Sequence, residues 1–538
     1  MPAMASEVDF GQQRCMKRGD TGAPARWLPV VGLLVLVVAA SAHGADAPEA
    51  GTELQKQIDA GAALYGQRCA TCHDHPRERI PPRESLGYRS PEAVFRALTR
   101  GVMKDVAGSL DADQARELTA FLTGRMPGSL PKPKPNRCAG DAVPVVARAN
   151  DWPVIGRDLE NTRYAAQPGW RAEETARLAL KWVFAYPEGA TGPPIAVGGR
   201  VFLASGTGEV FSLDAHSGCA WWTYASDRLV RGVSFGTRAD GGAAVFFGDH
   251  KGFVTALDAR TGALLWTSQI EDHVLAKITA PPSVFDGRVY VPVSSIEDPL
   301  QHEATYACCT FRGSVVALDA ATGRILWKTY TIPEEPKPLA RRTPDGPPRY
   351  GPAGAAIWNP LTIDRKRGLV YATTGESYDD GNPEGAHAII AWDLATGEQR
   401  WLRQFKPEPE ARACREGGGE SDCRNLFEFG TPVVLHTLAS GKQILLAGQK
   451  SGFVYGLDPD ADGAPLWRAR PAQGGDMGGI MYGLAVDASA LYAPISDLEL
   501  QAPARPGGLV ALDAASGETR WRVEGHEPVC SWGAEGCV

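Results

Sequence analysis

A short phrase that recurs six times after residue 150 constrains the fold more than any other feature of the sequence. Each copy has an aspartate, then a turn that ends in glycine, then a tryptophan four residues after that glycine; the copies end at Trp222, Trp266, Trp327, Trp401, Trp467 and Trp521. The aspartate can bond local backbone N–H groups, the glycine can take positive φ, and the tryptophan can dock on the neighbouring copy. Units of short strands repeated every 40 to 75 residues or so are typical of propeller blades. The sequence therefore predicts an all-β propeller over residues 150–538.

The N-terminus has the layout of a secretory signal. An apolar run over residues 27–42 follows basic residues and ends in small ones, and it is shorter than the roughly 20 residues that span a membrane. We expect residues 1–45 to be a signal peptide that is cleaved between Ala42 and Ala45, with Met16 as an alternative start. The mature protein is then periplasmic or secreted, with no stable membrane span.

The motif GQRCATCHDH indicates covalent haem. Cys69, Cys72 and His73 have the spacing that attaches c-type haem, in which two thioethers anchor the porphyrin and the histidine binds the iron. The alternatives are a zinc site or a redox pair, which an exported chain with histidine directly after the second cysteine does not favour. We therefore predict haem c as a cofactor.

The residues around this motif predict a small all-α cytochrome c domain over residues 52–126. DAGAALYGQRC, PEAVFRALTRGV and DADQARELTAFLTG each place apolar residues at helical spacing. A methionine is expected as the second iron ligand. Met103, between the last two helices, is the first choice and Met126 the alternative. The alternation of proline and lysine that follows predicts a semi-rigid linker over residues 127–149.

The charge of the chain excludes a nucleic-acid partner. Acidic residues number 63 and basic residues 55, which gives a net charge of −8, and the two signs are interspersed. A nucleic-acid binder would concentrate basic residues on one face. A composition of 43% hydrophobic and 22% charged residues is that of an ordinary soluble protein with two or three domains.

Longer phrases resemble the quinoprotein alcohol dehydrogenase family. They are DWPVIGRDLENTRY, CCTFRGSVVALDAATG, GPAGAAIWNPLTID and GQKSGFVYGLDPD, and the resemblance covers nearly the whole chain after the signal. It implies a propeller of eight blades with tryptophan docking motifs, and the fused cytochrome is similar to that of family members acting on polyvinyl alcohol. The chain stops 17 residues after Trp521, where another copy should begin. We therefore expect a C-terminally incomplete ring, either as a fragment or as an open propeller with exposed edges.

The resemblance also implies pyrroloquinoline quinone (PQQ) on the propeller axis beside Ca²⁺. An alcohol would pass a hydride to the quinone, and the electrons would leave through the haem. Matching motif by motif assigns quinone binding to Arg231, Thr279, Trp358 and Lys450, with Lys277 as a weaker neighbour. A core tryptophan and a solvated turn lysine are the ordinary alternatives at Trp358 and Lys450.

Acidic residues are assigned to calcium and to the base in the same way. Glu297 and Glu376 fall at the calcium-ligand positions that the resemblance implies, although both could be exposed loop acids. The Asp-x-Trp-Asn phrase that usually supplies the base is missing after GEQRW. Asp422 or Glu428 could replace it, or the site has no base.

The cysteine count leaves several pairings open. Ten cysteines remain after export, and haem takes two of them. Cys414 with Cys423 and Cys530 with Cys537 could close small loops, and Cys138 could reach Cys219, which leaves Cys308 and Cys309 for each other. In the family that the chain resembles, a vicinal disulfide forms a lid on the quinone. Two cross-bridges or free thiols are the alternatives.

Three functions are consistent with these features. The first is an exported quinohaemoprotein dehydrogenase that oxidises a secondary alcohol or a polyol polymer and passes electrons to a periplasmic acceptor. The second is a non-catalytic propeller scaffold, because similar phrases occur in outer-membrane assembly proteins and a fold does not fix a function. The third is a docking module fused to an electron-transfer cytochrome. The haem motif favours the first over the second, whereas the missing Asp-x-Trp-Asn phrase and the early stop favour the third.

Overall fold

The protein is described from a computed structural model. The structure describes residues 49–74, 83–87, 91–101, 103–108, 110–128, 136–167, 169–186, 192–226, 228–302, 306–340, 347–379, 381–405, 413–414, 423–424, 428–475, 478–496 and 507–525. The predicted signal peptide, Asp422, Cys530 and Cys537 lie outside these residues. None of the helices in the described part of the chain has the length and apolar character needed to cross a bilayer.

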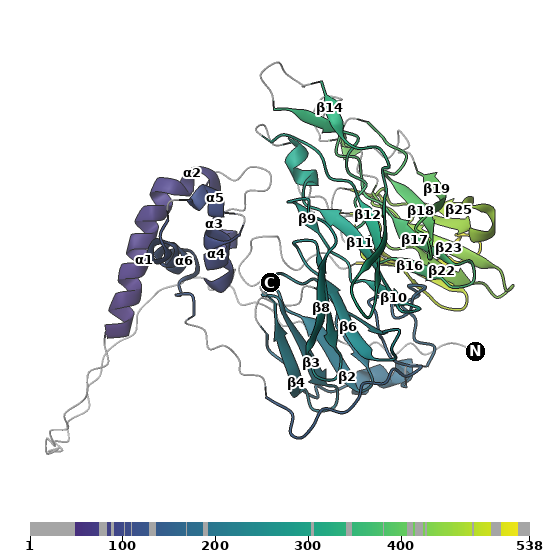
Figure 1. Cartoon of the computed structure of the whole chain (residues 1–538), viewed down its shortest axis with the longest axis horizontal. Helices are drawn as coiled ribbons and strands as arrows, with labels where there is room; N and C mark the ends of the chain where they lie inside the picture. Colours follow the sequence, from purple (N-terminus) through teal and green to yellow (C-terminus); the bar gives the residue numbers. More distant parts are fainter. Residues whose placement is uncertain are drawn as a thin grey trace, which may run out of the picture. The chain divides into compact units, whose positions relative to one another are not determined.

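The N-terminal part of the described chain is helical. Its helices are α1 (Glu49–Arg68), α2 (Ala70–His73), α3 (Arg83–Gly87), α4 (Pro91–Thr99), α5 (Lys104–Ala107) and α6 (Ala112–Thr123). Figure 1 shows them as a group coloured purple to dark blue. A capping box fixes the start of α6, since the Asp111 carboxylate accepts from the N–H groups of Asp113 and Gln114. Three of these helices, α1, α4 and α6, lie at the sequence positions where the apolar spacing predicts helices.

Helices α1 and α6 cross in close contact at Gly61. A Cβ atom at Gly61 would lie 2.0 Å from the carbonyl oxygen of Glu117, so only glycine fits there. Beside the crossing, the rings of Tyr65 and Phe121 pack with centroids 5.2 Å apart, and Leu118 is fully buried. This packing fixes the end of α1, from which the CATCH motif follows directly.

Six antiparallel sheets follow in chain order in the described part of residues 192–525; five have four strands, and the third has a short fifth strand beside its four (Figure 1). Their strands are β1 (Ile195–Val197), β2 (Arg200–Ala204), β3 (Glu209–Asp214), β4 (Ala220–Ala225); β5 (Ser234–Thr237), β6 (Ala243–Gly248), β7 (Phe253–Asp258), β8 (Leu264–Gln269); β10 (Ser283–Phe285), β11 (Arg288–Ser295), β12 (Ser314–Asp319), β13 (Ile325–Tyr330); β16 (Thr362–Asp364), β17 (Leu369–Thr373), β18 (Ala388–Asp393), β19 (Gln399–Gln404); β22 (Val434–Thr437), β23 (Gln443–Gly448), β24 (Val454–Asp458), β25 (Ala464–Ala469); β26 (Ala485–Val486), β27 (Ala490–Ile495), β28 (Gly508–Asp513) and β29 (Thr519–Glu524). The first strands of successive sheets lie next to one another. This is the arrangement of a β-propeller.

Shorter elements decorate the sheets. Strand β9 (Ala276–Lys277) pairs with the end of β11, and two ribbons are formed by β14 (Lys337–Leu339) with β15 (Arg349–Gly351) and by β20 (Ala413–Cys414) with β21 (Cys423–Arg424). Short 3₁₀ turns are η1 (Ala172–Arg177), η2 (Asp298–His302) and η5 (Pro459–Ala461). In the ribbon of β20 and β21, the backbone of Cys414 pairs with that of Cys423.

The tryptophans of the recurring phrase join each sheet to the next. The indole N–H of Trp222 donates to the carbonyl of Ala259, that of Trp266 to Ala320, and that of Trp327 to Leu394, over 3.0 to 3.2 Å. Each ring also lies on the turn glycine of the next copy. A Cβ atom on Gly323, for example, would come within 2.6 Å of the Trp266 ring. The phrase therefore supplies both halves of a contact between neighbouring sheets.

The segment that precedes β1 crosses the first strands of several sheets. Carbonyl groups of Trp152, Pro153, Leu159, Glu160 and Thr162 accept hydrogen bonds from the N–H groups of Ala196, Phe235, Ile363, Leu435 and Val486, respectively. These donors belong to β1, β5, β16, β22 and β26. One extended segment thus ties together five of the six sheets at their inner strands.

A disulfide fastens the chain before the propeller to its first sheet. Cys138 is bonded to Cys219, as predicted, and the Cys138 N–H donates to the carbonyl of Ala220 at the start of β4. Asn136 accepts a hydrogen bond from the N–H of Ala220 on the other side. The end of the predicted linker therefore lies along the outer strand of the first sheet.

Candidate functional site

Trp358, Glu428 and Lys450 form the centre of the candidate site. The Trp358 indole N–H donates to one oxygen of Glu428 at 3.1 Å, and the Lys450 ammonium forms an ion pair with the other oxygen. The ammonium also lies 5.8 Å from the centre of the Trp358 ring. The site thus combines a flat aromatic surface, a carboxylate and a cation that come from three different segments of the chain.

Backbone bonds hold these three residues in place. The Lys450 N–H donates to the Glu428 carbonyl at 3.1 Å, and the Asn359 side chain donates to the carbonyl of Phe429 at 3.0 Å. Because Asn359 follows Trp358 and Phe429 follows Glu428, the same bonds fix the indole and the carboxylate. The sequence singled out all three site residues, and the structure brings them together.

A pair of carboxyl groups lies beside this centre. Burial raises the pKa of Glu376 well above its usual value, and the charges of Asp298 and Glu428 and a hydrogen bond with Asp298 raise it further. Burial alone would lower the pKa of Lys450, but the attraction of Glu428, Glu376 and Asp298 outweighs it, and the pKa is raised. The site therefore carries three acidic side chains around one ammonium group.

Asp298 is a residue that the sequence analysis missed. Asp298 follows Glu297 directly and begins the turn η2. The sequence predicted Glu297 as a calcium ligand together with Glu376, but it is Asp298 whose side chain lies beside Glu376. The only signal was the acidic pair in SSIED, which does not say which of two neighbouring side chains faces the site. The Glu297 carboxylate accepts hydrogen bonds from Tyr306, Thr310 and Phe311 instead.

The neighbouring cysteines Cys308 and Cys309 form a vicinal disulfide, as predicted. Both residues are buried, at 8% and 0% exposure. The N–H of Tyr350 donates to the Cys308 carbonyl at 2.7 Å, which holds the pair against β15. Burial and this backbone hydrogen bond therefore hold the disulfide in a fixed position beside β15.

Basic side chains form a second cluster. Backbone bonds join Leu229 to His250 and Asp249 to Ile278, so Arg231, Lys251 and Lys277 come from segments that are held side by side. Burial lowers the pKa of Lys277, and the charges of Lys251 and Arg231 lower it further. Because these cations repel one another, an anion bound among them would stabilise their charged forms.

Two buried polar atoms in this basic cluster have no protein partner. They are Nε2 of His250 and Oγ1 of Thr279. Burial, with the charges of Lys277 and Arg231, lowers the pKa of His250 to about 3. Buried polar groups are normally hydrogen-bonded, so unpaired ones beside mutually repelling cations fit an anionic ligand such as a carboxylate.

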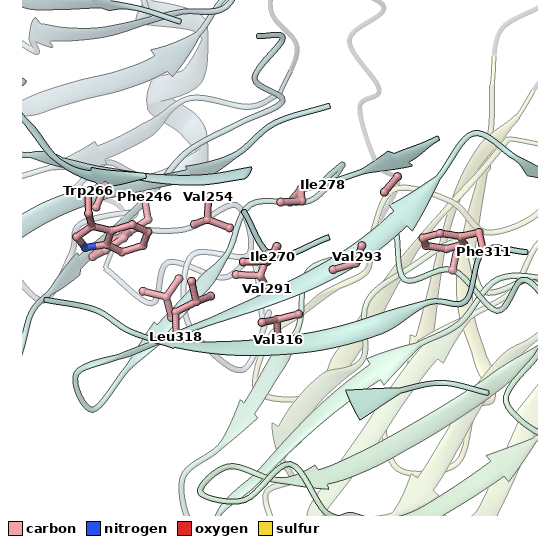
Figure 2. Packing of buried hydrophobic residues seen from close by; sticks show 14 of the residues in the cluster. Phe246, Val254, Trp266, Ile270, Ile278, Val291, Val293, Phe311, Val316 and Leu318 are labelled. Atoms are coloured by element: carbon pink, nitrogen blue, oxygen red, sulfur yellow. The ribbon is translucent and has the colours of Figure 1, made fainter. Parts of the chain in front are cut away.

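One buried cluster of side chains connects these groups. It contains Ala276 and Ile278 next to Lys277, the two bonded cysteines, Ala356 and Tyr378. Figure 2 shows Phe311 at one end of this cluster, with Val293 and Ile278 leading to it, and Trp266 at the other end. A single core therefore positions the basic cluster, the disulfide and the segments that carry the aromatic and acidic residues.

The acidic residues fit a metal ion only in part. Within the described ranges, no group of three or more His, Cys, Asp or Glu side chains is arranged to hold a metal on its own. Asp298 and Glu376 supply two carboxylates, whereas Ca²⁺ takes six to eight oxygen ligands. A calcium ion here would need further oxygens from a bound ligand, from the backbone or from water.

The haem motif begins at Cys69, between helices α1 and α2, and continues through α2, which contains Cys72 and His73. Cys69 is half-buried and Cys72 exposed, both are free thiols, and the His73 side chain is 7% exposed. Met103 is the N-cap residue of α5 and is half-buried, and Met126 follows α6. Two free thiols beside a buried histidine fit thioether attachment of haem, and the choice between the two methionines stays a prediction.

Comparisons with known proteins agree with this geometry. Residues 152–407 match the family described as glucose/ethanol/alcohol dehydrogenase, beta-propeller domain, and residues 450–532 match the outer membrane protein assembly factor BamB family. The chain is 34% identical over 499 residues to polyvinylalcohol dehydrogenase of a Pseudomonas species, which covers 88% of this chain and 77% of that protein. It is 34% identical over 518 residues to polyvinylalcohol dehydrogenase of Sphingopyxis sp. (strain 113P3), covering 90% and 78%.

A solved structure shows the same fold. The quinohemoprotein alcohol dehydrogenase of Comamonas testosteroni superposes with a TM-score of 0.54 over 71% of this chain and 68% of that one, at 22% sequence identity. At this identity, the likeness bears on the fold alone. The residues of the candidate site must therefore be judged from their own contacts.

Proposed function

Because the chain belongs to the polyvinyl alcohol dehydrogenase family of PQQ-dependent alcohol dehydrogenases, we propose that it is an exported quinohaemoprotein that oxidises a secondary alcohol or a polyol polymer. The observation that carries the proposal is the contact of Glu428 with both Trp358 and Lys450. A carboxylate held in this way can accept a hydroxyl proton, and the indole offers a face for a planar ring.

The residues that would hold PQQ are the Trp358 ring, the Cys308–Cys309 bridge, Lys450 and the basic cluster. The basic cluster has the charge for the carboxylates of the quinone, with Arg231 and Thr279 as donors from the sequence prediction and His250 as an additional one. When bound, PQQ supplies an acceptor for the hydride of the alcohol carbon. The protein supplies the orientation and the base.

Glu428 is the residue that we assign to the hydroxyl proton. One of its oxygens binds the Trp358 N–H and the other binds Lys450, so the carboxylate cannot turn away from the aromatic face. The Lys450 ammonium forms an ion pair with Glu428, which compensates the cost of burying the carboxylate. When Glu428 takes the hydroxyl proton of the alcohol, its carboxylate would become neutral and its ion pair with Lys450 would weaken. The Lys450 ammonium could then stabilise the negative charge that develops on the alcohol oxygen.

Glu376 and Asp298 are the carboxylates that we assign to Ca²⁺. Protons and calcium compete for Glu376, whose pKa is raised. We therefore expect calcium affinity to increase as the pH rises from about 5 to about 8, because the carboxyl must lose its proton to bind the ion. Isothermal titration of the PQQ-loaded protein at several pH values measures this.

Glu376→Gln provides the control for that titration. The variant should lose both the calcium affinity and its pH dependence. The pKa of Glu376 is higher in the folded protein than in the unfolded chain. The free energy of unfolding of the parent protein therefore falls as the pH rises from the unfolded-state pKa to the folded-state pKa. The variant should therefore melt at a higher temperature than the parent protein at pH 7 when both are metal-free. A parent protein whose calcium affinity does not change with pH would contradict the assignment.

The haem would carry the electrons away from the site. We assign the covalent bonds to Cys69 and Cys72 and the iron to His73 and Met103, and we propose a periplasmic acceptor as the partner. The free thiols and the buried histidine support this assignment. The expected location is the periplasm or the outside of the cell, given the signal-like N-terminus.

A non-catalytic scaffold is the second candidate. The match of residues 450–532 to an outer-membrane assembly family favours it. A scaffold requires neither a cluster of mutually repelling cations nor a buried carboxylate bound to lysine, because both cost free energy of folding. For this reason we rank the dehydrogenase first.

An absorption experiment separates the two functions. Protein matured with haem is mixed with PQQ, Ca²⁺ and either 2-butanol or polyvinyl alcohol, and reduction of the haem is followed. We expect reduction only when quinone, calcium and alcohol are all present. If dithionite reduces the haem and neither alcohol does, the dehydrogenase proposal fails and the scaffold remains.

A further inference from the structure

Glu297 is a fully buried carboxylate that the proposed reaction does not use. Its exposure is 0%, and its side chain accepts hydrogen bonds from the Tyr306 hydroxyl at 2.9 Å, the Thr310 N–H at 3.0 Å and the Phe311 N–H at 2.8 Å. A buried charge is costly unless it is paired or well hydrogen-bonded. The donors on Glu297 meet this requirement without a metal ion.

These donors lie on both sides of the vicinal disulfide. Tyr306 comes two residues before Cys308, and the N–H groups of Thr310 and Phe311 come directly after Cys309. The carboxylate therefore holds the segment that carries the disulfide at its entry and at its exit. Glu297 itself follows β11, so the anchor belongs to the third sheet.

His273 adds a second hold on the same segment. The Leu275 N–H donates to Nδ1 of His273 at 3.3 Å, so Nδ1 is the acceptor and Nε2 carries the hydrogen. Nε2 lies 3.0 Å from the Thr310 hydroxyl and 3.8 Å from Glu297, and the imidazole packs edge-on against the Phe311 ring. His273 therefore fixes the two residues that follow the disulfide.

We infer that Glu297 is a positioning residue that holds the Cys308–Cys309 bridge against the quinone site, and that Asp298, its neighbour, serves the acidic pair. The inference rests on the proposed function for the identity of the ligand. It differs from the calcium role that the sequence suggested for Glu297. The hydrogen bonds occupy the oxygens that calcium would need, and they end on the disulfide segment.

The test compares Glu297→Gln with a matched control, Asp364→Asn. The Asp364 carboxylate is also fully buried and also accepts two backbone N–H groups and a tyrosine hydroxyl, from Lys366, Arg367 and Tyr371. It differs in lying in another turn and in pairing with the Arg367 guanidinium at 2.6 Å. Reduction of the vicinal disulfide by a phosphine is followed by alkylation and peptide mass spectrometry on haem-loaded, quinone-free protein. We expect the disulfide of Glu297→Gln to be reduced about tenfold faster than that of the parent protein, because hydrogen bonds to a charged acceptor are lost. In Asp364→Asn, the reduction rate should change by less than about twofold.

Calcium and quinone binding give the second readout. Glu297→Gln should bind PQQ about tenfold more weakly, while its calcium affinity stays within about twofold of the parent value. A large loss of calcium affinity, or an unchanged reduction rate, would overturn the inference. If Glu297→Gln does not fold, Tyr306→Phe removes one donor alone and should speed reduction about threefold. Reduction is measured without alcohol or quinone, so a failure here is distinct from a failure of the dehydrogenase proposal.

Discussion

Glutamine in place of Glu428 is expected to lower the turnover of alcohol by a factor of about 10² to 10⁴, which is the usual contribution of a general base. The amide cannot accept the hydroxyl proton, yet it keeps the size of the side chain and can still accept from the Trp358 N–H. PQQ binding should therefore change by only a few fold. The measurement is the initial rate of haem reduction at saturating alcohol, with PQQ affinity from titration of the quinone absorbance.

Two further variants locate the base. Glu428→Asp keeps the charge beside Lys450 and should recover part of the rate, which a purely structural role would not require. Asp422→Asn tests the other candidate from the sequence, which lies outside the described part of the chain. If Glu428→Gln keeps more than half of the parent turnover while Asp422→Asn loses it, the base is Asp422.

The recurring phrase predicted the propeller because its physics is local. In the third sheet, Asp319 accepts from the Thr322 N–H at 2.8 Å and Gly323 has φ 72°, which are the turn contacts that the sequence implies. The sheet on which each tryptophan packs follows from the order of the copies. The number of blades does not follow from local contacts. The described residues form six sheets of four or five strands and two two-stranded ribbons, whereas the resemblance predicts an incomplete ring of the eight-bladed type.

The candidate site was predictable mainly where the family resemblance reached. It placed Trp358 and Lys450, while Glu428 was one of two candidates for the base and the vicinal disulfide one of several open cysteine pairings. The role of Asp298 was missed because neighbouring side chains point to different surroundings, and the chain alone does not say which of two acids faces inward. Lys251 and His250 were missed because Arg231 and Lys277 meet them only after three segments fold together.

The segment from Trp152 to Thr162 shows the same limit. Its phrase was recognised only through family resemblance, although its carbonyls bind the inner strands of five sheets. Nothing in its composition indicates this role. A backbone contact with strands up to 330 residues away depends on how the sheets are placed, and hydrogen-bonding capacity is the same for every residue except proline.

Alanine in place of Trp266 should cause the largest loss of stability among the interfaces between sheets. The ring is 8% exposed, packs on Phe246, donates to the Ala320 carbonyl and covers Gly323. Its removal leaves a cavity and a buried carbonyl without its donor, so we expect a loss of about 3 to 5 kcal/mol in the free energy of unfolding. Urea unfolding followed by far-UV circular dichroism measures it, because the strands of the propeller dominate the change.

Trp521 is the matched control for that experiment. It occupies the same position in the sixth copy of the phrase, but it is 42% exposed, so its ring buries much less area than Trp266. Trp521→Ala should therefore cost less than about 1 kcal/mol. Gly323→Ala tests the contact from the other side, since φ is 72° and the added methyl group would meet the Trp266 ring. If Trp266→Ala and Trp521→Ala lose the same free energy of unfolding, packing between the sheets does not set the stability. If Trp266→Ala and Gly323→Ala both lose much of it, the contact between Trp266 and Gly323 is the source.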